Sequence, residues 1–201
     1  MITHISAELL KLRTTRTTKG ILIAALAVAG LLGAATVGTA GGDNATLGTA
    51  GNLANVVGVS SLPAIVMLIV GILAMAGEYQ HRTVTATFLA TPRRGRVLVA
   101  KLTAVGAAGP PVALGMMVVA LAAALPSMWI DGTTIDLINR PVLEAFGGNL
   151  LAATLFGVLG VSLGAVIRNQ LAAVTIAIGW AFLIEGILSL FLGPDTVRWM
   201  P

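Results

Sequence analysis

Five long stretches without a charged residue constrain the fold of this 201-residue sequence more than any other feature. The stretches are 20–42, 56–77, 102–130, 145–167 and 169–194, of which the last is interrupted only by Glu185. About 20 apolar residues cross a hydrocarbon core of about 30 Å as an α-helix. The sequence therefore predicts an all-α polytopic membrane protein. We expect one transmembrane domain over residues 1–201, with spans near 20–41, 57–77, 98–125, 146–167 and 171–193.

The composition excludes several other classes of protein. Hydrophobic residues make up 57% of the sequence and charged residues only 10%, whereas a soluble domain carries about 25% charge. So few charges cannot cover the surface of a small globule. The sequence has no cysteine, which excludes disulfides, thiolate metal sites and thiol catalysis. The net charge is +4, but the basic residues flank apolar spans, so we expect lipid headgroups or an acidic protein surface as partners and no nucleic acid.

Lysine and arginine are distributed unevenly between the two sides of the predicted membrane domain. Ten of the twelve lie before the first span, between the second and third spans, or between the fourth and fifth. The opposite side has Arg140 and Arg198. Because cytoplasmic segments beside membrane spans are enriched in these residues, we predict that the N-terminus is cytoplasmic. Five spans would then place residue 201 on the outer side.

Residues 2–15 are predicted to form an amphipathic helix in the inner headgroup layer. Apolar residues recur at helical spacing, and polar residues occupy the other faces. The apolar residues are Ile2, Ile5, Leu9 and Leu12, and the polar ones are His4, Glu8, Lys11 and Arg13. The segment is too short and too polar to cross the membrane, and its basic end favours anionic lipid. It is either a simple membrane anchor or a lever that a cytosolic partner pushes.

The segment between the second and third spans, residues 78–97, is the most distinctive part of the sequence, and we call it the coupling loop. Together with Lys101 it carries five of the twelve basic residues. Val84, Phe88 and Leu89 could form the apolar edge of a short surface helix, and Pro92 is suited to the first position of the next helix. Such an element would fit the groove of a partner protein, but an ordinary basic loop that sets the topology would have the same composition.

The pattern of residues in and around the coupling loop resembles the first cytoplasmic loop of small type-2 ABC exporter permeases. The matching residues are Gly77-Glu78-Tyr79, Thr83, Phe88-Leu89, Thr91-Pro92-Arg93-Arg94-Gly95-Arg96 and Lys101-Leu102. Two further segments also resemble that family, namely residues 8–13 and 164–170. The resemblance therefore runs over most of the sequence, and the coupling loop is its most specific part.

The resemblance implies a membrane pore made of two permeases, as a homodimer or a heterodimer, in the bacterial cell membrane. Two separate cytosolic ATPase subunits would drive it and would bind the ATP and magnesium. The N-terminal helix, through Ile5, Leu9, Leu12, Lys11 and Arg13, and the coupling loop would contact the ATPase. In the loop, the resemblance assigns this contact to Glu78, Tyr79, Arg82, Phe88, Leu89, Arg93, Arg94 and Arg96. Permeases of this kind usually have six spans, and the absence of a sixth suggests a truncated sequence or a fragment.

The sequence contains no phosphate-binding loop of the Gly-x-x-x-x-Gly-Lys-Ser/Thr type. We therefore expect this chain to be a transport subunit and not an enzyme, with ATP hydrolysis on a partner chain and no cofactor of its own. The two histidines, His4 and His81, give no metal-site spacing, since Glu78-x-x-His81 lacks the second histidine of a zinc-protease helix.

Several residues within the predicted spans are candidates for special roles. Glu185 should face protein or water, either lining the transport path or paired with a hydroxyl or an arginine. The segment Gly109-Pro110-Pro111 predicts a kink or local unwinding, used either as a hinge or as a static bend. Gly157, Gly160 and Gly164 permit close helix approach, within the bundle or at a dimer interface. Lys101 is expected to extend toward the inner interface.

Two other functional hypotheses fit the same sequence. One is a carrier or channel without an ATPase that uses Glu185 as a proton or ion site. The other is a membrane scaffold or immunity-type protein that transports nothing, for which five spans would suffice.

Overall fold

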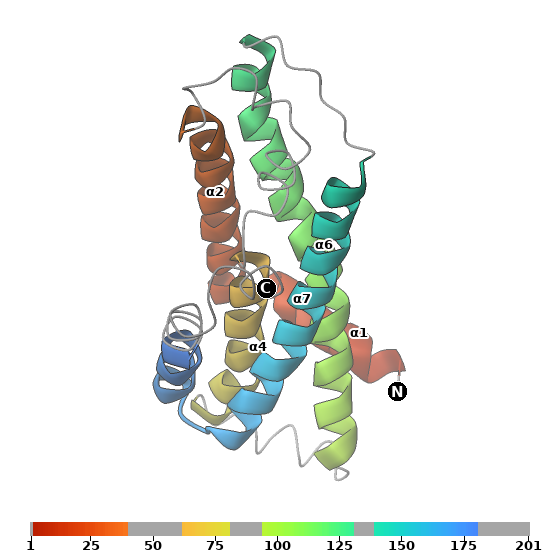
Figure 1. The fold of residues 1–201 in the computed structure, drawn as a ribbon. Helices are drawn as coiled ribbons and strands as arrows, with labels where there is room; N and C mark the ends of the chain where they lie inside the picture. Colours follow the sequence, from red (N-terminus) through yellow and green to blue (C-terminus); the bar gives the residue numbers. More distant parts are fainter. Residues whose placement is uncertain (1, 40–61, 81–93, 131–138, 181–201) are drawn as a thin grey trace, which may run out of the picture.

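The computed structural model describes residues 2–39, 62–80, 94–130 and 139–180. Five helices carry labels in Figure 1, and one more follows them. The labelled helices are α1 (Ile2–Thr14), α2 (Arg16–Thr39), α4 (Leu62–Gln80), α6 (Arg94–Ile130) and α7 (Arg140–Val166). The last described helix is Gln170–Trp180. These ranges contain no strand, and the predicted all-α fold is confirmed.

Within the described residues, four helices are long and apolar enough to cross a membrane, so the chain is a polytopic membrane protein. Their apolar parts are Arg16–Ala35, Leu62–Gln80, Gly95–Pro126 and Arg140–Val166. They overlap the first four predicted spans, with ends displaced by several residues. The fifth predicted span, 171–193, begins within the helix Gln170–Trp180. The rest of that span, including Glu185, lies outside the described residues.

The helix α6 is the longest element, with 37 residues and a length of about 55 Å. It therefore exceeds a hydrocarbon core of about 30 Å, and part of it must lie outside the core. Pro110 and Pro111 lie inside it, but the segment stays α-helical, so the predicted alternative of local unwinding is wrong. Figure 1 shows instead that the axis of α6 bends over its middle, as proline in a helix interior leads one to expect.

The helices α4 and α7 cross with their backbones in contact because glycine lies at the crossing point. A Cβ atom at Gly71 of α4 would collide with the carbonyl oxygen of Gly157, and one at Gly160 would collide with the carbonyl oxygen of Leu68. At Gly164 a Cβ would lie 2.9 Å from the carbonyl oxygen of Ile72. These glycines of α7 pack inside the bundle, which confirms that reading of the sequence.

Glycine also allows α6 to approach α7 on one side and α2 on the other. A Cβ at Gly109 would lie 2.9 Å from the backbone of Thr154 in α7, and one at Gly33 of α2 would collide with the backbone of Ala120 in α6. The residues that α2 contributes to this contact are small, since Ala25 and Ala29 pack in one group with Met116 of α6. The helix α6 is thus held on two sides.

The helix α1 lies across the bundle, whereas α2, α4, α6 and α7 run lengthwise (Figure 1). Thr15 is the non-helical residue between α1 and α2, and its backbone remains in the hydrogen-bond ladder. Its N–H donates to the Lys11 carbonyl at 2.9 Å, and its carbonyl accepts from the Lys19 N–H at 3.1 Å. Leu12 packs against both of the buried groups that α6 shares with its neighbours. The apolar side of α1 is therefore turned toward the bundle.

Candidate functional site

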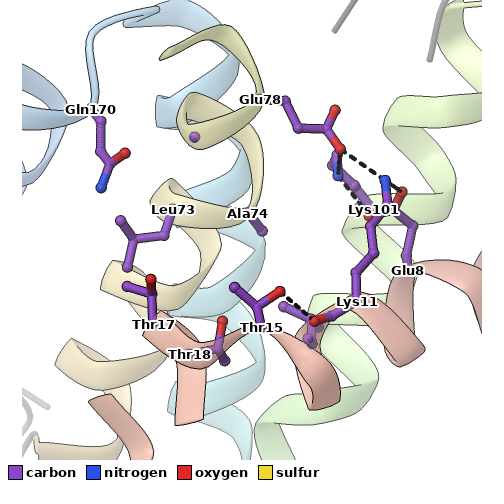
Figure 2. Close-up of a pocket in the computed structure, with 12 residues that line it drawn as sticks. Glu8, Lys11, Thr15, Thr17, Thr18, Leu73, Ala74, Glu78, Lys101 and Gln170 are labelled. Atoms are coloured by element: carbon purple, nitrogen blue, oxygen red, sulfur yellow. Dashed lines mark hydrogen bonds and ion pairs between the residues drawn. The ribbon is translucent and has the colours of Figure 1, made fainter. Parts of the chain in front are cut away.

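Lys101 of α6 is the largest fully buried side chain among the described residues. Its Nζ donates to Glu8 Oε2 at 2.6 Å and to Glu78 Oε1 at 2.8 Å. Glu8 comes from α1 and Glu78 from the last turn of α4, so three helices converge on one ammonium group (Figure 2). Burying an unpaired ammonium is strongly unfavourable, and two carboxylates compensate it here.

Lys11 completes a group of four charges, which we call the ion cluster: Glu8, Lys11, Glu78 and Lys101. The Lys11 Nζ lies 3.0 Å from Glu8 Oε1 and 3.0 Å from Glu78 Oε1. The side chain of Lys11 is 53% exposed, against 2% for Lys101, 12% for Glu8 and 13% for Glu78. The four charges of the cluster sum to zero. We call the buried end at Lys101 the dry end and the solvent-exposed end at Lys11 the wet end.

The two carboxylates also act on the ionisation of Lys11. Burial alone would lower the pKa of its ammonium group, but hydrogen bonds to Glu78 and Glu8, and the charges of both, outweigh burial and raise the pKa. Lys11 therefore forms ion pairs with both carboxylates at the exposed end of the cluster.

Local sequence explains how each charge reaches the cluster. Glu8 and Lys11 are three residues apart on α1, which places them on neighbouring positions of one face. On α6, Val97 and Val105 lie one turn to either side of Lys101, and both are buried. Lys101 therefore lies on the face of α6 that turns toward the bundle, where the other buried side chains are apolar.

The ion cluster joins the two helices from which the coupling loop emerges. Glu78 lies two residues before the end of α4, and Lys101 lies seven residues after the start of α6. Residues 81–93 of the loop lie outside the described residues. The Glu78–Lys101 pair thus holds both ends of the loop together, and Glu8 attaches α1 to the same place.

An open pocket of about 400 Å³ adjoins the ion cluster. All four cluster residues help to line it, together with three threonines near the α1–α2 corner and with Gln170 (Figure 2). The threonines are Thr15, Thr17 and Thr18. Apolar wall residues, including Leu12 and Leu73, complete the lining. The pocket leaves free space beside α1.

Tyr79 connects the end of α4 to the turn that follows α7. The guanidinium carbon of Arg168 lies 5.8 Å from the centre of the Tyr79 ring, a distance typical of a cation–π contact. The ring is half-buried and packs against the buried group that contains Met67 and Met75. Asn169 then caps the next helix, since its Oδ1 accepts from the Ala172 N–H at 3.2 Å.

A comparison with protein-family models matches residues 4–184 to the ABC-2 family transporter protein. The chain belongs to the ABC-2 transporter family. The match includes every residue of the ion cluster and all four described spans. Neither the curated proteins nor the solved structures that were compared with the chain give a match. The resemblance to type-2 ABC permeases is confirmed, and the chain is a multi-pass membrane subunit of an ABC transporter.

In this ABC-2 permease, the residues predicted to contact an ATPase lie in different surroundings. Glu78 and Tyr79 make the intramolecular contacts given above. Arg94 begins α6, and Arg96 is exposed in its first turn. Arg82, Phe88, Leu89 and Arg93 lie outside the described residues.

The residues predicted for the interfacial helix of the permease all lie in α1. Ile5, Leu9 and Leu12 are half-buried, whereas Lys11 and Arg13 are exposed. The basic end of α1 is thus open to solvent or to a partner.

Sequence reasoning missed the partnership of Glu8 with Lys101 in this permease. The helical spacing predicts that Glu8 lies on a polar face of the amphipathic helix, but the residue is buried against Lys101. Lys101 itself was a signal, because a lysine inside an apolar run needs a counter-ion. Its partners could not be read from the sequence, since Glu8 lies 93 residues away and several other acidic residues were available.

Proposed function

We propose that this chain is the permease of an ABC exporter whose ATP hydrolysis takes place on separate cytosolic ATPase subunits. Two permeases, identical or different, would form the transport path in a bacterial cell membrane. ATP and magnesium would bind to the ATPase. The observation that carries the proposal is the ion cluster in a chain of the ABC-2 family. It connects α1 and both ends of the coupling loop, the elements through which a partner would act.

The charge of the surface around these elements favours an acidic partner. Arg13 and Arg96 are exposed on α1 and at the start of α6, whereas the charge of Lys11 is compensated within the ion cluster. Arg82, Arg93 and Arg94 in the coupling loop and at the start of α6 add three more positive charges. A positive patch of this kind steers an acidic surface into place and fixes its orientation. Phe88 and Leu89 would supply the apolar centre of the contact.

The packing of the helices suggests how a push on the coupling loop would spread. The loop leaves from α4 and α6, and α4 is locked against α7 at the glycine crossing. A displacement of the loop would therefore move α4 together with α7, and the ion cluster would carry the displacement to α1. In this scheme Gly109-Pro110-Pro111 acts as a static bend, because Gly109 presses against Thr154 and has little room to open.

Purification of the tagged chain in mild detergent tests the proposal. We expect an ATPase with a phosphate-binding loop to co-purify in an equimolar ratio, and the particle mass to correspond to two permeases. The variant Arg93→Ala/Arg94→Ala/Arg96→Ala should lose the ATPase. Arg140→Ala, which removes an exposed arginine from the start of α7, serves as the matched control and should retain it. Absence of any ATPase from the unmodified complex would contradict the proposal.

A further inference from the structure

We propose that α1 docks reversibly on the bundle, with Glu8 as the releasable partner of Lys101 and Glu78 as its permanent partner. The inference concerns the chain by itself; the use of this movement in transport rests on the proposed function.

The ion cluster divides along the boundary of α1 into two ion pairs. Glu8 and Lys11 both belong to α1, and their charged atoms are 3.0 Å apart. Glu78 and Lys101 both belong to the bundle, and theirs are 2.8 Å apart. Two contacts cross the boundary, Lys101 to Glu8 at 2.6 Å and Lys11 to Glu78 at 3.0 Å. If α1 moves away, each side keeps one positive and one negative charge.

This division removes the main obstacle to breaking a buried ion pair. Taking one partner from a buried pair is costly because the other charge is left without compensation. Here Lys101, the most buried of the four, would keep Glu78 when Glu8 leaves. Glu8 and Lys11 would leave together on an amphipathic helix suited to the headgroup layer.

The other contacts of α1 are also consistent with release. Most of its described side chains are exposed or half-buried, and Glu8 is the buried exception. Leu12 packs against two buried groups of the bundle but is itself only half-buried. The pocket of about 400 Å³ borders α1 and leaves space into which it can shift. α1 would turn at Thr15, the non-helical residue between α1 and α2, whose backbone hydrogen bonds to Lys11 and Lys19 would have to adjust.

The proposal predicts opposite effects for the two glutamates. Glu8→Gln weakens the shorter of the two contacts that cross the boundary of α1, while Lys101 keeps Glu78, so α1 should be released more often. Glu78→Gln also weakens the contact of Lys11 across the boundary, but it makes Glu8 the carboxylate that remains beside the more deeply buried Lys101. Release of α1 would then leave a buried ammonium without a counter-ion, so α1 should be released less often. A cluster that is merely structural would be loosened by either change.

Because the chain has no cysteine, single introduced cysteines can report the position of α1. We would place Leu12→Cys in the unmodified, Glu8→Gln and Glu78→Gln backgrounds and measure labelling by a maleimide in lipid nanodiscs without ATPase. Labelling should be about tenfold faster with Glu8→Gln, the size expected for loss of one hydrogen bond to a charged group, and slower with Glu78→Gln. Leu10→Cys, on an exposed position of α1, should label at one rate in all backgrounds.

Two further variants keep the test decisive if Glu78→Gln folds poorly. Lys101→Gln/Glu78→Gln removes both charges of the bundle, so α1 should be released as readily as with Glu8→Gln. Glu144→Gln, in the exposed pair with Arg140 on α7, should leave labelling of Leu12→Cys unchanged. Equal acceleration by Glu8→Gln and Glu78→Gln, or no change with either, would overturn the proposal. Since no ATPase is present, this outcome is independent of the partner proposed above.

Discussion

The ammonium group of Lys101 and the carboxylate of Glu8 lie 2.6 Å apart, although 93 residues separate them in the sequence. One belongs to a membrane-spanning helix and the other to a helix that lies across the bundle. The contact sets the register of docked α1 relative to the ends of α4 and α6. An amphipathic helix held only by lipid would have no such register.

Replacing Lys101 should destabilise the protein strongly. Lys101→Met leaves two mostly buried carboxylates close together with only the half-exposed Lys11 to compensate them. We expect a loss of about 3 kcal/mol, the size typical of breaking a buried ion pair by removing one partner. Thermal unfolding in detergent measures the effect. A Lys101→Met protein as stable as the unmodified one would show that the carboxylates do not depend on this lysine.

Replacing Lys11 removes the same charge at a much lower cost. Lys11→Met leaves Lys101 with both carboxylates, and water reaches the vacated end of the cluster. We expect a loss below about 1 kcal/mol, as for exposed ion pairs. The same unfolding measurement should therefore rank the two lysines clearly. Equal losses would mean that the dry and wet ends do not differ in the folded protein.

The glycine crossing of α4 and α7 can be tested with two variants of α7, one at the crossing and one away from it as the control. Gly160→Ala puts a methyl group against the carbonyl oxygen of Leu68 and should cost about 2 kcal/mol through strain or helix separation. Gly148→Ala, also on α7, meets no atom within 4 Å and should stabilise by about 0.5 kcal/mol because alanine is the better helix former. If both variants were stabilising, the two backbones would not be in contact.

The coupling loop gives a prediction about function. Phe88→Asp, or reversal of Arg93 and Arg94 to glutamate, should abolish the response of the co-purified ATPase to the permease, since the apolar centre or the charge complementarity is lost. Arg140→Ala should leave that response intact. ATPase rates in reconstituted vesicles measure it. Transport that survives these loop substitutions but is abolished by Glu185→Gln would favour the ATPase-independent carrier.

The amount that could be predicted from the sequence differs between the fold and the site. The apolar stretches define the spans because the hydrocarbon core sets their length, and α2, α4, α6 and α7 lie over them. The close approach of Gly157, Gly160 and Gly164 also follows from their missing side chains, although only the structure shows that α4 is their partner. The ion cluster was not predictable, because pairing among charges on three helices depends on how those helices pack.

The effect of Pro110 and Pro111 on the shape of α6 could not be predicted from the local sequence. Two prolines in succession remove two backbone donors, which allows either a kink or local unwinding when the segment is considered alone. In the protein, packing of Gly109 on Thr154 supports the helix at that level, and it bends without opening. Tertiary contacts thus decide between outcomes that the local sequence leaves equivalent.

The uninterrupted course of α6 has a mechanical consequence. Gly109, where its backbone presses on α7, divides it into arms of about 22 Å toward Arg94 and about 32 Å toward Ile130. A tilt about this fulcrum would swing the two ends in opposite directions, with the far tip travelling about 1.4 times as far as the near one. A tilt of that kind would need no turn of the helix to unfold, because α6 is helical from Arg94 to Ile130.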